Sequence, residues 1–145
     1  TRDMAVLVAL SALAQGKAPP PLIALDDESA ADVMRGPLDV LLMFETSWCD
    51  ACGMLNPHLA RLQQLVNSAE EMPVPLFVAT IDAERWTALA TAHGVTKYPS
   101  ILYFAASRRS SPAFFPGTDM ASLLQFVAVQ AQLGSARTGG HGSGV

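Results

Sequence analysis

The sequence predicts an α/β domain in which a mixed central sheet carries helices on both faces. Three observations lead to this fold class. Short apolar runs alternate along the chain with segments of helical periodicity. Two of the runs, 40–44 and 76–81, are continuously apolar, as in strands that are covered on both faces. The runs at 100–104 and 113–115 lie close enough in sequence to form an antiparallel pair.

The first predicted strand is 22–25, and a helix follows it to about Met34. Asp26 or Asp27 is suited to cap this helix, because a short acidic side chain accepts hydrogen bonds from the free N–H groups of the first turn. The Gly-Pro pair at 36–37 ends the helix, since proline cannot continue it. The buried strand 40–44 comes next.

A longer helix is predicted over 49–68, with leucines at helical spacing and Pro57 inside it, where a kink is expected. The second buried strand, 76–81, follows. Residues 84–92 form the next predicted helix, which Gly94 ends because glycine readily adopts the left-handed conformation found there.

Strands 100–104 and 113–115 are joined by a polar turn at 107–111. Within this turn, Arg108 and Arg109 are adjacent cations, and long charged side chains are mostly solvated. We therefore expect both arginines to belong to a solvated hairpin turn rather than to a binding patch.

Thr118 or Asp119 is predicted to cap the last helix, whose inner face carries apolar residues at helical spacing. The predicted order is β-α-β-α-β-α-β-β-α. Early crossovers imply parallel strands, and the late pair implies antiparallel ones. A chain of 145 residues fits one domain, and we assign that domain to 20–133.

The two ends of the chain differ in composition from the domain. Within 1–19, an apolar run is followed by small residues at Ala12 and Ala14, as in a secretory signal peptide and its cleavage site. The alternative is a short buried or docking helix. At the other end, 134–145 is rich in glycine and serine and is predicted to be a flexible tail.

Composition excludes several classes of function. The net charge of −4 disfavours nucleic acid and anionic membranes as partners, because both attract clustered lysine and arginine. The chain has two cysteines, which are too few for a disulfide-rich scaffold. No apolar run reaches the roughly 18 residues that a membrane-spanning helix requires.

The two cysteines, Cys49 and Cys52, lie where strand 40–44 gives way to the helix that follows. Disulfide exchange needs a thiolate, and a helix N-terminus stabilises one through its free N–H groups and dipole. A spacing of one helical turn brings the two sulfurs within bonding reach. Cys49 is at the exposed start of the helix and is predicted to attack, while Cys52 is predicted to resolve.

Two other interpretations of the pair stay open. The cysteines are half of a zinc site if two of His58, His93 and His141 complete it. Alternatively, the pair is an inert structural disulfide. The position before a helix favours a redox pair.

The segment FETSWCDAC at 44–52, followed by Pro57, resembles the active-site strand and helix of the thioredoxin superfamily. The segment GVTKYPSI at 94–101 resembles the cis-proline segment of protein disulfide isomerase domains. The resemblance extends over roughly 20–132. It implies a thioredoxin-like three-layer sandwich, similar to a single domain of the isomerase type.

The resemblance also implies a site. The Tyr98-Pro99 peptide bond would be cis and packed against the cysteines, and the backbone of Tyr98 would hydrogen-bond an extended substrate as an added strand. Trp48 is expected to shield the cysteines and, together with Tyr98 and Pro99, to form the substrate-binding surface. No cofactor and no metal ion are expected.

The sequence departs from the family pattern around the cysteines. Met43 stands where the family usually buries a carboxylate, and a methionine cannot act as a general base. We expect Glu45 to lie away from the Met43 face and not to replace that carboxylate. Asp50 and Ala51 are predicted to tune the redox pair, because the negative charge of Asp50 disfavours a thiolate at Cys49. The disulfide should therefore be less oxidising than that of an isomerase.

Two functions follow from these residues. The first is a thiol-disulfide oxidoreductase that acts on protein or peptide thiols and disulfides through Cys49 and Cys52. If the first segment is a signal peptide, the compartment is the secretory pathway, with the lumen of the endoplasmic reticulum favoured. The alternative is a catalytically weak structural or adaptor subunit of a larger organellar assembly, whose partner subunits hold the two terminal segments.

Overall fold

The computed structural model describes residues 22–66 and 75–139, with side chains described as far as residue 133. The expected signal-like or docking segment at 1–19 lies outside the described residues. Within the described part of the chain, no helix is both long enough and apolar enough to cross a membrane.

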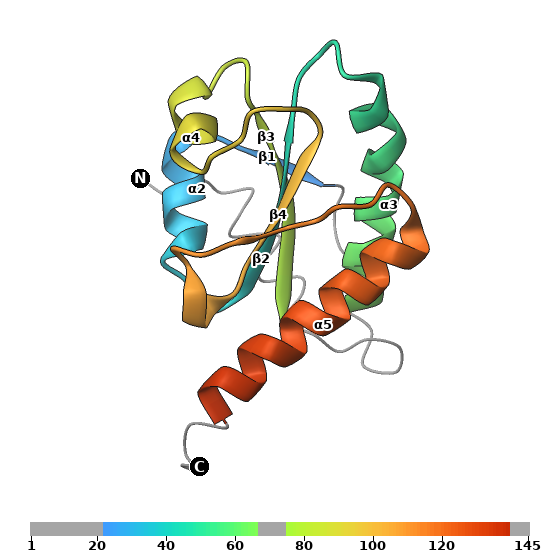
Figure 1. Ribbon diagram of the computed structural model, residues 1–145. Helices are drawn as coiled ribbons and strands as arrows, with labels where there is room; N and C mark the ends of the chain where they lie inside the picture. The colour runs from blue at the N-terminus through green and yellow to red at the C-terminus, as the bar shows by residue number, and fades with distance from the viewer. Residues whose placement is uncertain (1–21, 67–74, 140–145) are drawn as a thin grey trace.

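The sheet has five strands in the order β1-β3-β2-β4-β5. β1, β2 and β3 are parallel to one another, β4 runs antiparallel to β2, and β5 runs antiparallel to β4, which confirms the predicted mixed sheet (Figure 1). In chain order the strands are β1 (Ile23–Leu25), β2 (Asp39–Glu45), β3 (Leu76–Asp82), β4 (Ser100–Phe104) and β5 (Ala113–Phe114).

Two pairs of helices cover the sheet, one pair on each face (Figure 1). They are α2 (Asp27–Met34) and α4 (Thr87–Ala92) on one face, and α3 (Asp50–Val66) and α5 (Met120–Gly139) on the other. Each central strand contributes side chains to both cores, because alternate side chains point to opposite faces of the sheet. In β2, Leu42 and Phe44 join the α2 and α4 core, whereas Met43 joins the α3 and α5 core with both cysteines. The predicted three-layer arrangement is confirmed.

The helix ends agree with the expected caps and stops. Asp26 caps α2 in a reciprocal capping box with Ser29, and Asp119 accepts a hydrogen bond from the Ser122 backbone N–H at 2.7 Å at the start of α5. Gly94 follows α4 with a φ of 75°. The helix α3 continues through Pro57.

Apart from one-residue shifts at strand and helix ends, the structure differs from the predicted elements in three places. The helix predicted over 84–92 begins only at Thr87, because the Asp82 side chain accepts hydrogen bonds from the Glu84 and Arg85 N–H groups and holds them in a turn. The polar turn after β4 contains the short 3₁₀ helix η1 (Ala106–Arg108). The helix α5 continues past residue 133 to Gly139, and 140–145 of the expected tail lies outside the described residues.

The expectation that both turn arginines are solvated is wrong for Arg109. Its guanidinium donates hydrogen bonds to the carbonyl oxygens of Phe104, Gly36 and Leu38 at 3.0, 2.8 and 2.6 Å. These carbonyls lie at the end of β4 and just before β2, so one side chain ties the two strands together. Sequence position alone could not reveal this, because the carbonyls of Gly36 and Leu38 are more than 70 residues away.

Asp39 completes the polar contacts at this end of the sheet. Its carboxylate accepts hydrogen bonds from the Tyr103 hydroxyl at 2.5 Å and the Ala106 N–H at 2.8 Å. Burial, together with the nearby Asp39 carboxylate, raises the pKa of Tyr103 well above its usual value. Tyr103 therefore stays protonated and acts as a hydrogen-bond donor.

We expect Asp26→Ala to lower the free energy of unfolding by about 1 kcal/mol, because the cap of α2 is lost. The hydrogen bonds from Ser29 lower the pKa of Asp26, so this contribution is present above the unfolded-state pKa and is lost as the pH falls through the folded-state pKa. Urea unfolding at neutral and acidic pH measures both effects. Asp27→Ala removes a neighbouring charge that is not the cap, and an equal loss in that variant would contradict the assignment.

Candidate active site

The two cysteines form a disulfide at the junction between β2 and α3, with their Cα atoms 5.3 Å apart. The turn before α3 is closed by a hydrogen bond from the Cys49 N–H to the Thr46 carbonyl at 3.3 Å. The Cys52 N–H then points at the Cys49 sulfur at 3.1 Å. Cys49 is 9% exposed and Cys52 only 2% exposed. The first sulfur is thus the more accessible one, and it receives a helix N-terminal N–H group.

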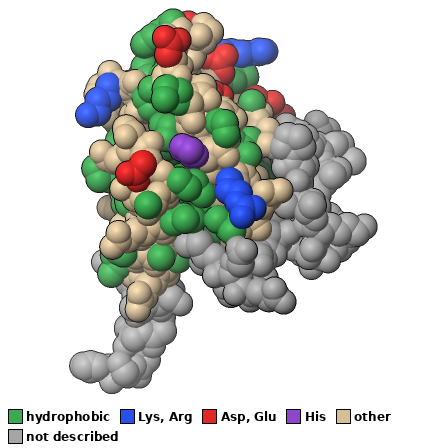
Figure 2. All heavy atoms as spheres, turned by 90° about the vertical axis from the view of Figure 1, so that its right-hand side faces the viewer, with side chains coloured by type: hydrophobic (Ala, Val, Ile, Leu, Met, Phe, Trp, Pro, Cys, Tyr) green, Lys and Arg blue, Asp and Glu red, His purple; other side chains and the backbone are tan. Residues whose placement is uncertain are grey.

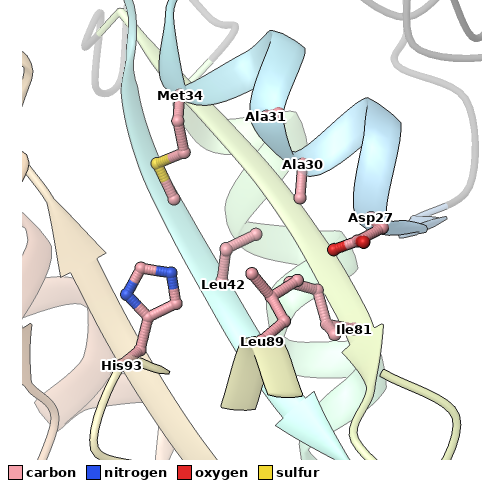
Figure 3. A pocket seen from close by; sticks show the side chains of 8 residues that line it. All are labelled: Asp27, Ala30, Ala31, Met34, Leu42, Ile81, Leu89 and His93. Carbon is pink, nitrogen blue, oxygen red and sulfur yellow. The ribbon is translucent and has the colours of Figure 1, made fainter. Parts of the chain in front are cut away.

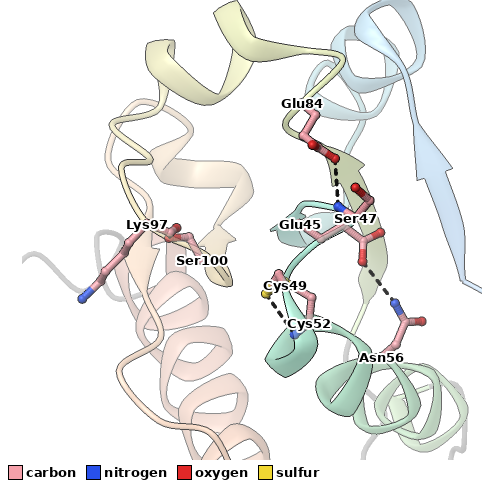
Figure 4. The surroundings of a disulfide bond; sticks show 8 residues. All are labelled: Glu45, Ser47, Cys49, Cys52, Asn56, Glu84, Lys97 and Ser100. Carbon is pink, nitrogen blue, oxygen red and sulfur yellow. Dashed lines mark hydrogen bonds between the residues drawn. A yellow bond between two sulfur atoms is a disulfide. The ribbon is translucent and has the colours of Figure 1, made fainter.

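The Tyr98-Pro99 peptide bond is cis, as predicted. The loop that carries it ends at Ser100 and faces the disulfide, as the positions of Lys97 and Ser100 show in Figure 4. Tyr98 packs against the same apolar core as the cysteines and makes an edge-on contact with Trp48, with ring centroids 5.9 Å apart. Segments nearly fifty residues apart are therefore brought together at the site.

The rim of the site is apolar and exposed. Trp48 is 64% exposed, so it borders the disulfide rather than enclosing it. Met54, in the first turns of α3, is 73% exposed, and no sequence pattern indicated a role for it. Cys52 and Leu55 are nearly one helical turn apart and both face the core. Met54 points away from that side of the helix, which explains its exposure. Asp50 and Ala51 are exposed too. Figure 2 shows hydrophobic side chains with scattered single charges on the face that α3 and α5 form.

Hydrogen bonds to residues just after β3 hold the loop that carries Trp48. The Ser47 N–H donates a hydrogen bond to the Glu84 carboxylate at 2.8 Å (Figure 4). The Ala83 N–H donates to the Glu45 carbonyl at 2.8 Å. The carboxyl ends of the parallel strands β2 and β3 are thereby joined beside the disulfide.

The expected placement of Glu45 is wrong. Residues two apart in a strand share a face, so Glu45 lies on the Met43 face, which α3 covers. Its carboxylate accepts a hydrogen bond from the Asn56 side chain of α3 at 3.4 Å (Figure 4). Burial raises the pKa of Glu45, and the negative charge of Asp82 raises it further. A half-buried carboxyl group with an elevated pKa therefore lies on the side of the sheet that carries the cysteines.

The structure excludes His93 from the zinc site that the sequence left open. His93 contacts the rings of Phe44 and Phe104, with centroids 6.0 and 5.0 Å away, on the face of the sheet opposite the cysteines. Burial lowers the pKa of His93. Among the described residues, no three metal-binding side chains gather into a possible site. His141 lies outside the described residues.

A pocket of about 220 Å³ lies on that opposite face, between α2 and α4. Figure 3 shows His93 at one side of it and Asp27 at the other, with apolar side chains such as Leu42 and Leu89 between them. Since its walls belong to the other core, this pocket is separate from the disulfide.

Comparison with known proteins identifies the fold family. Residues 22–128 match the thioredoxin family. The chain belongs to the thioredoxin family. Among solved structures, it is similar to a thioredoxin mutant from Halobacterium salinarum, with 27% identity and a TM-score of 0.62 over 77% of this chain and 90% of that one. Human ERp44 in its zinc-bound form has a similar fold, with a TM-score of 0.65 and 18% identity over 77% of this chain and 30% of that one.

Curated relatives of this thioredoxin domain are disulfide isomerases. Protein disulfide isomerase-like 2-1 of Oryza sativa is 27% identical over 61% of this chain and 23% of the relative. Protein disulfide-isomerase erp38 of Neurospora crassa is 28% identical over 88% of this chain and 34% of the relative. Protein disulfide-isomerase of Aspergillus oryzae is 34% identical over 59% of this chain and 15% of the relative. The thioredoxin domain thus spans about a third or less of the length of these relatives.

Proposed function

We propose that this thioredoxin domain is a thiol-disulfide oxidoreductase that acts on protein or peptide disulfides. The observation that carries the proposal is the position of the Cys49–Cys52 pair at the N-terminus of α3, facing the cis Tyr98-Pro99 loop. The reduced pair would then be oxidised as the substrate disulfide is reduced.

The geometry supports separate roles for the two cysteines. Cys49 is the more accessible sulfur, and the Cys52 N–H directed at it would stabilise its thiolate. The Cys49 thiolate attacks one sulfur of the substrate disulfide and releases the other as a thiolate. Cys52 then attacks Cys49, which releases the second substrate sulfur and closes the disulfide seen here.

The apolar rim supports a peptide substrate. An extended segment that hydrogen-bonds the backbone at Tyr98 would place its disulfide over Cys49, with Pro99 below it. Trp48 and Met54 expose large apolar surfaces on either side of the pair, which suit the side chains next to a substrate cysteine. The interaction depends on shape and apolar contact, so one domain of this kind would accept many sequences.

Asp50 and Ala51 are proposed to tune the reduction potential of the Cys49–Cys52 disulfide. An exposed carboxylate next to Cys49 disfavours the thiolate and therefore the reduced form. The proposed compartment is the secretory pathway, and the disulfide-isomerase names of the curated relatives support it. The missing carboxylate at Met43 favours a second candidate, an adaptor subunit of an organellar assembly in which the pair stays oxidised.

The reduction potential of the pair distinguishes these two functions. We expect equilibration with glutathione buffers, followed by thiol alkylation, to give a potential above about −300 mV, in the range of exchanging disulfides. A potential below that value would mark an inert structural bridge and would favour the adaptor.

A further inference from the structure

The resolving thiol, Cys52, must lose a proton before it can attack. Only a thiolate is an effective nucleophile in disulfide exchange. Cys52 is 2% exposed and is packed among the apolar residues of the α3 and α5 core. Burial in apolar surroundings disfavours the anion, so resolution needs a nearby group that accepts the proton.

Glu45 is a half-buried carboxyl group on this face of the sheet, at the end of β2 that leads to the cysteines. It ends β2, two residues after the buried Met43, and it reaches across to α3. Its hydrogen-bond donor, Asn56, lies four residues after Cys52 on the same helix. Residues four apart on a helix are neighbours on one side of it, so Asn56 holds the carboxylate beside the turn that carries Cys52. Figure 4 shows the two cysteines, Glu45 and Asn56 together.

The surroundings of Glu45 make its carboxylate a stronger base than an ordinary glutamate. Desolvation is the main cause of its raised pKa, and the Asp82 carboxylate on β3 adds to the effect. Hydrogen bonds from Thr80 and Asn56 act in the opposite direction. Asp82 faces solvent beside Glu45 in the register of the parallel strands, so it is the charged group to vary.

We propose that Glu45 accepts the proton of the Cys52 thiol during resolution, and that Asn56 positions its carboxylate. The inference rests on the proposed function, because it concerns the second step of disulfide exchange. In that step the Cys52 S–H proton passes to the Glu45 carboxylate, and the new thiolate attacks the Cys49 sulfur. The Cys49–substrate S–S bond breaks, and the substrate leaves as a thiolate. Glu45 then returns the proton to solvent.

The two steps can be followed separately with the reduced protein and an excess of the aromatic disulfide 5,5′-dithiobis(2-nitrobenzoic acid). The attack of Cys49 releases one coloured thiolate, and the attack of Cys52 on the mixed disulfide releases a second. We expect Glu45→Gln to leave the first phase unchanged and to slow the second by roughly 10²-fold, the lower end of what a positioned proton acceptor contributes.

The pH profile of the second phase tests the identity of the group. In the wild type, the rate is expected to fall as the pH drops through the raised pKa of Glu45, because the protonated carboxyl cannot accept a proton. Asp82→Asn removes the repulsion and should move this fall to lower pH, whereas Glu45→Gln should abolish it. Asp27→Asn neutralises an exposed carboxylate on α2, which covers the opposite face of the sheet, and it should match the wild type.

The outcomes separate the two proposals. If the wild type shows no first phase, the proposed function itself is wrong. If the first phase is present and Glu45→Gln resolves at the wild-type rate with the same pH profile, Glu45 is not the proton acceptor. An equal loss in Asp27→Asn, or an unshifted profile in Asp82→Asn, would also overturn the assignment.

Discussion

Replacing Cys49 with serine is expected to reduce the catalysed reduction of insulin by dithiothreitol to the background rate. A serine hydroxyl at neutral pH is a poor nucleophile, and a single remaining thiol cannot form the internal disulfide that completes the cycle. Cys52 cannot take over the first attack, because it is only 2% exposed beneath the first turn of α3. The measurement is the onset and rate of insulin turbidity with the wild type and the variant.

Cys52→Ser is the matched control, since it removes the other sulfur by the same change. It should keep the first attack and accumulate a mixed disulfide between Cys49 and the substrate, which mass spectrometry detects. If the wild type is no faster than Cys49→Ser, the oxidoreductase proposal fails and the adaptor function is favoured. If Cys52→Ser accumulates no mixed disulfide and Cys49→Ser does, the two roles are reversed.

Replacing Arg109 with alanine is expected to lower the free energy of unfolding by about 2–3 kcal/mol, the largest effect on stability that we predict from one surface position. The guanidinium donates to three carbonyls, and hydrogen bonds from a charged group contribute about 1.5–3 kcal/mol each without being additive. The carbonyls of Phe104, Gly36 and Leu38 would lose this donor, and the ends of β4 and β2 would lose their link. Guanidinium chloride unfolding measures the loss.

Arg108→Ala is the control for charge and position. Arg108 is the adjacent residue, and its guanidinium donates a long hydrogen bond to Gln130 at 3.5 Å. Its buried Nε has no hydrogen-bond partner among the described residues. We expect a change within about 0.5 kcal/mol, as for ordinary surface substitutions. A similar loss in both variants would show that the three carbonyl contacts are not what stabilises this end of the sheet.

The local features of the fold were predictable because their causes are close together in sequence. The apolar runs of β2 and β3, the Asp26 cap and the stop at Gly94 each depend on a few adjacent residues. The cysteine pair was predictable for the same reason, since a strand followed by a helix places both sulfurs in one turn. The helix predicted from 84 began later because the Asp82 side chain competes for the first N–H groups.

The expected position of Glu45 is wrong because residues two apart in a strand share a face, which places Glu45 with Met43. What alternation could not predict is its partner. The hydrogen bond to Asn56 and the repulsion from Asp82 depend on where α3 and β3 pack against the end of β2. The exposed rim at Met54 likewise depends on which side of α3 meets the sheet.

By itself, the sequence determined the alternation of strands and helices, the caps, and the paired sulfurs at a helix start, since interactions within a few residues decide each of these. The meeting of the cis Tyr98-Pro99 loop with the disulfide was expected only from the family resemblance. The tertiary structure alone decided that Arg109 joins two strands and that Asn56 of α3 holds the Glu45 carboxylate. These contacts join residues far apart in the chain. Their partners are chosen only when the sheet order and the helix faces are set by burial of the two cores.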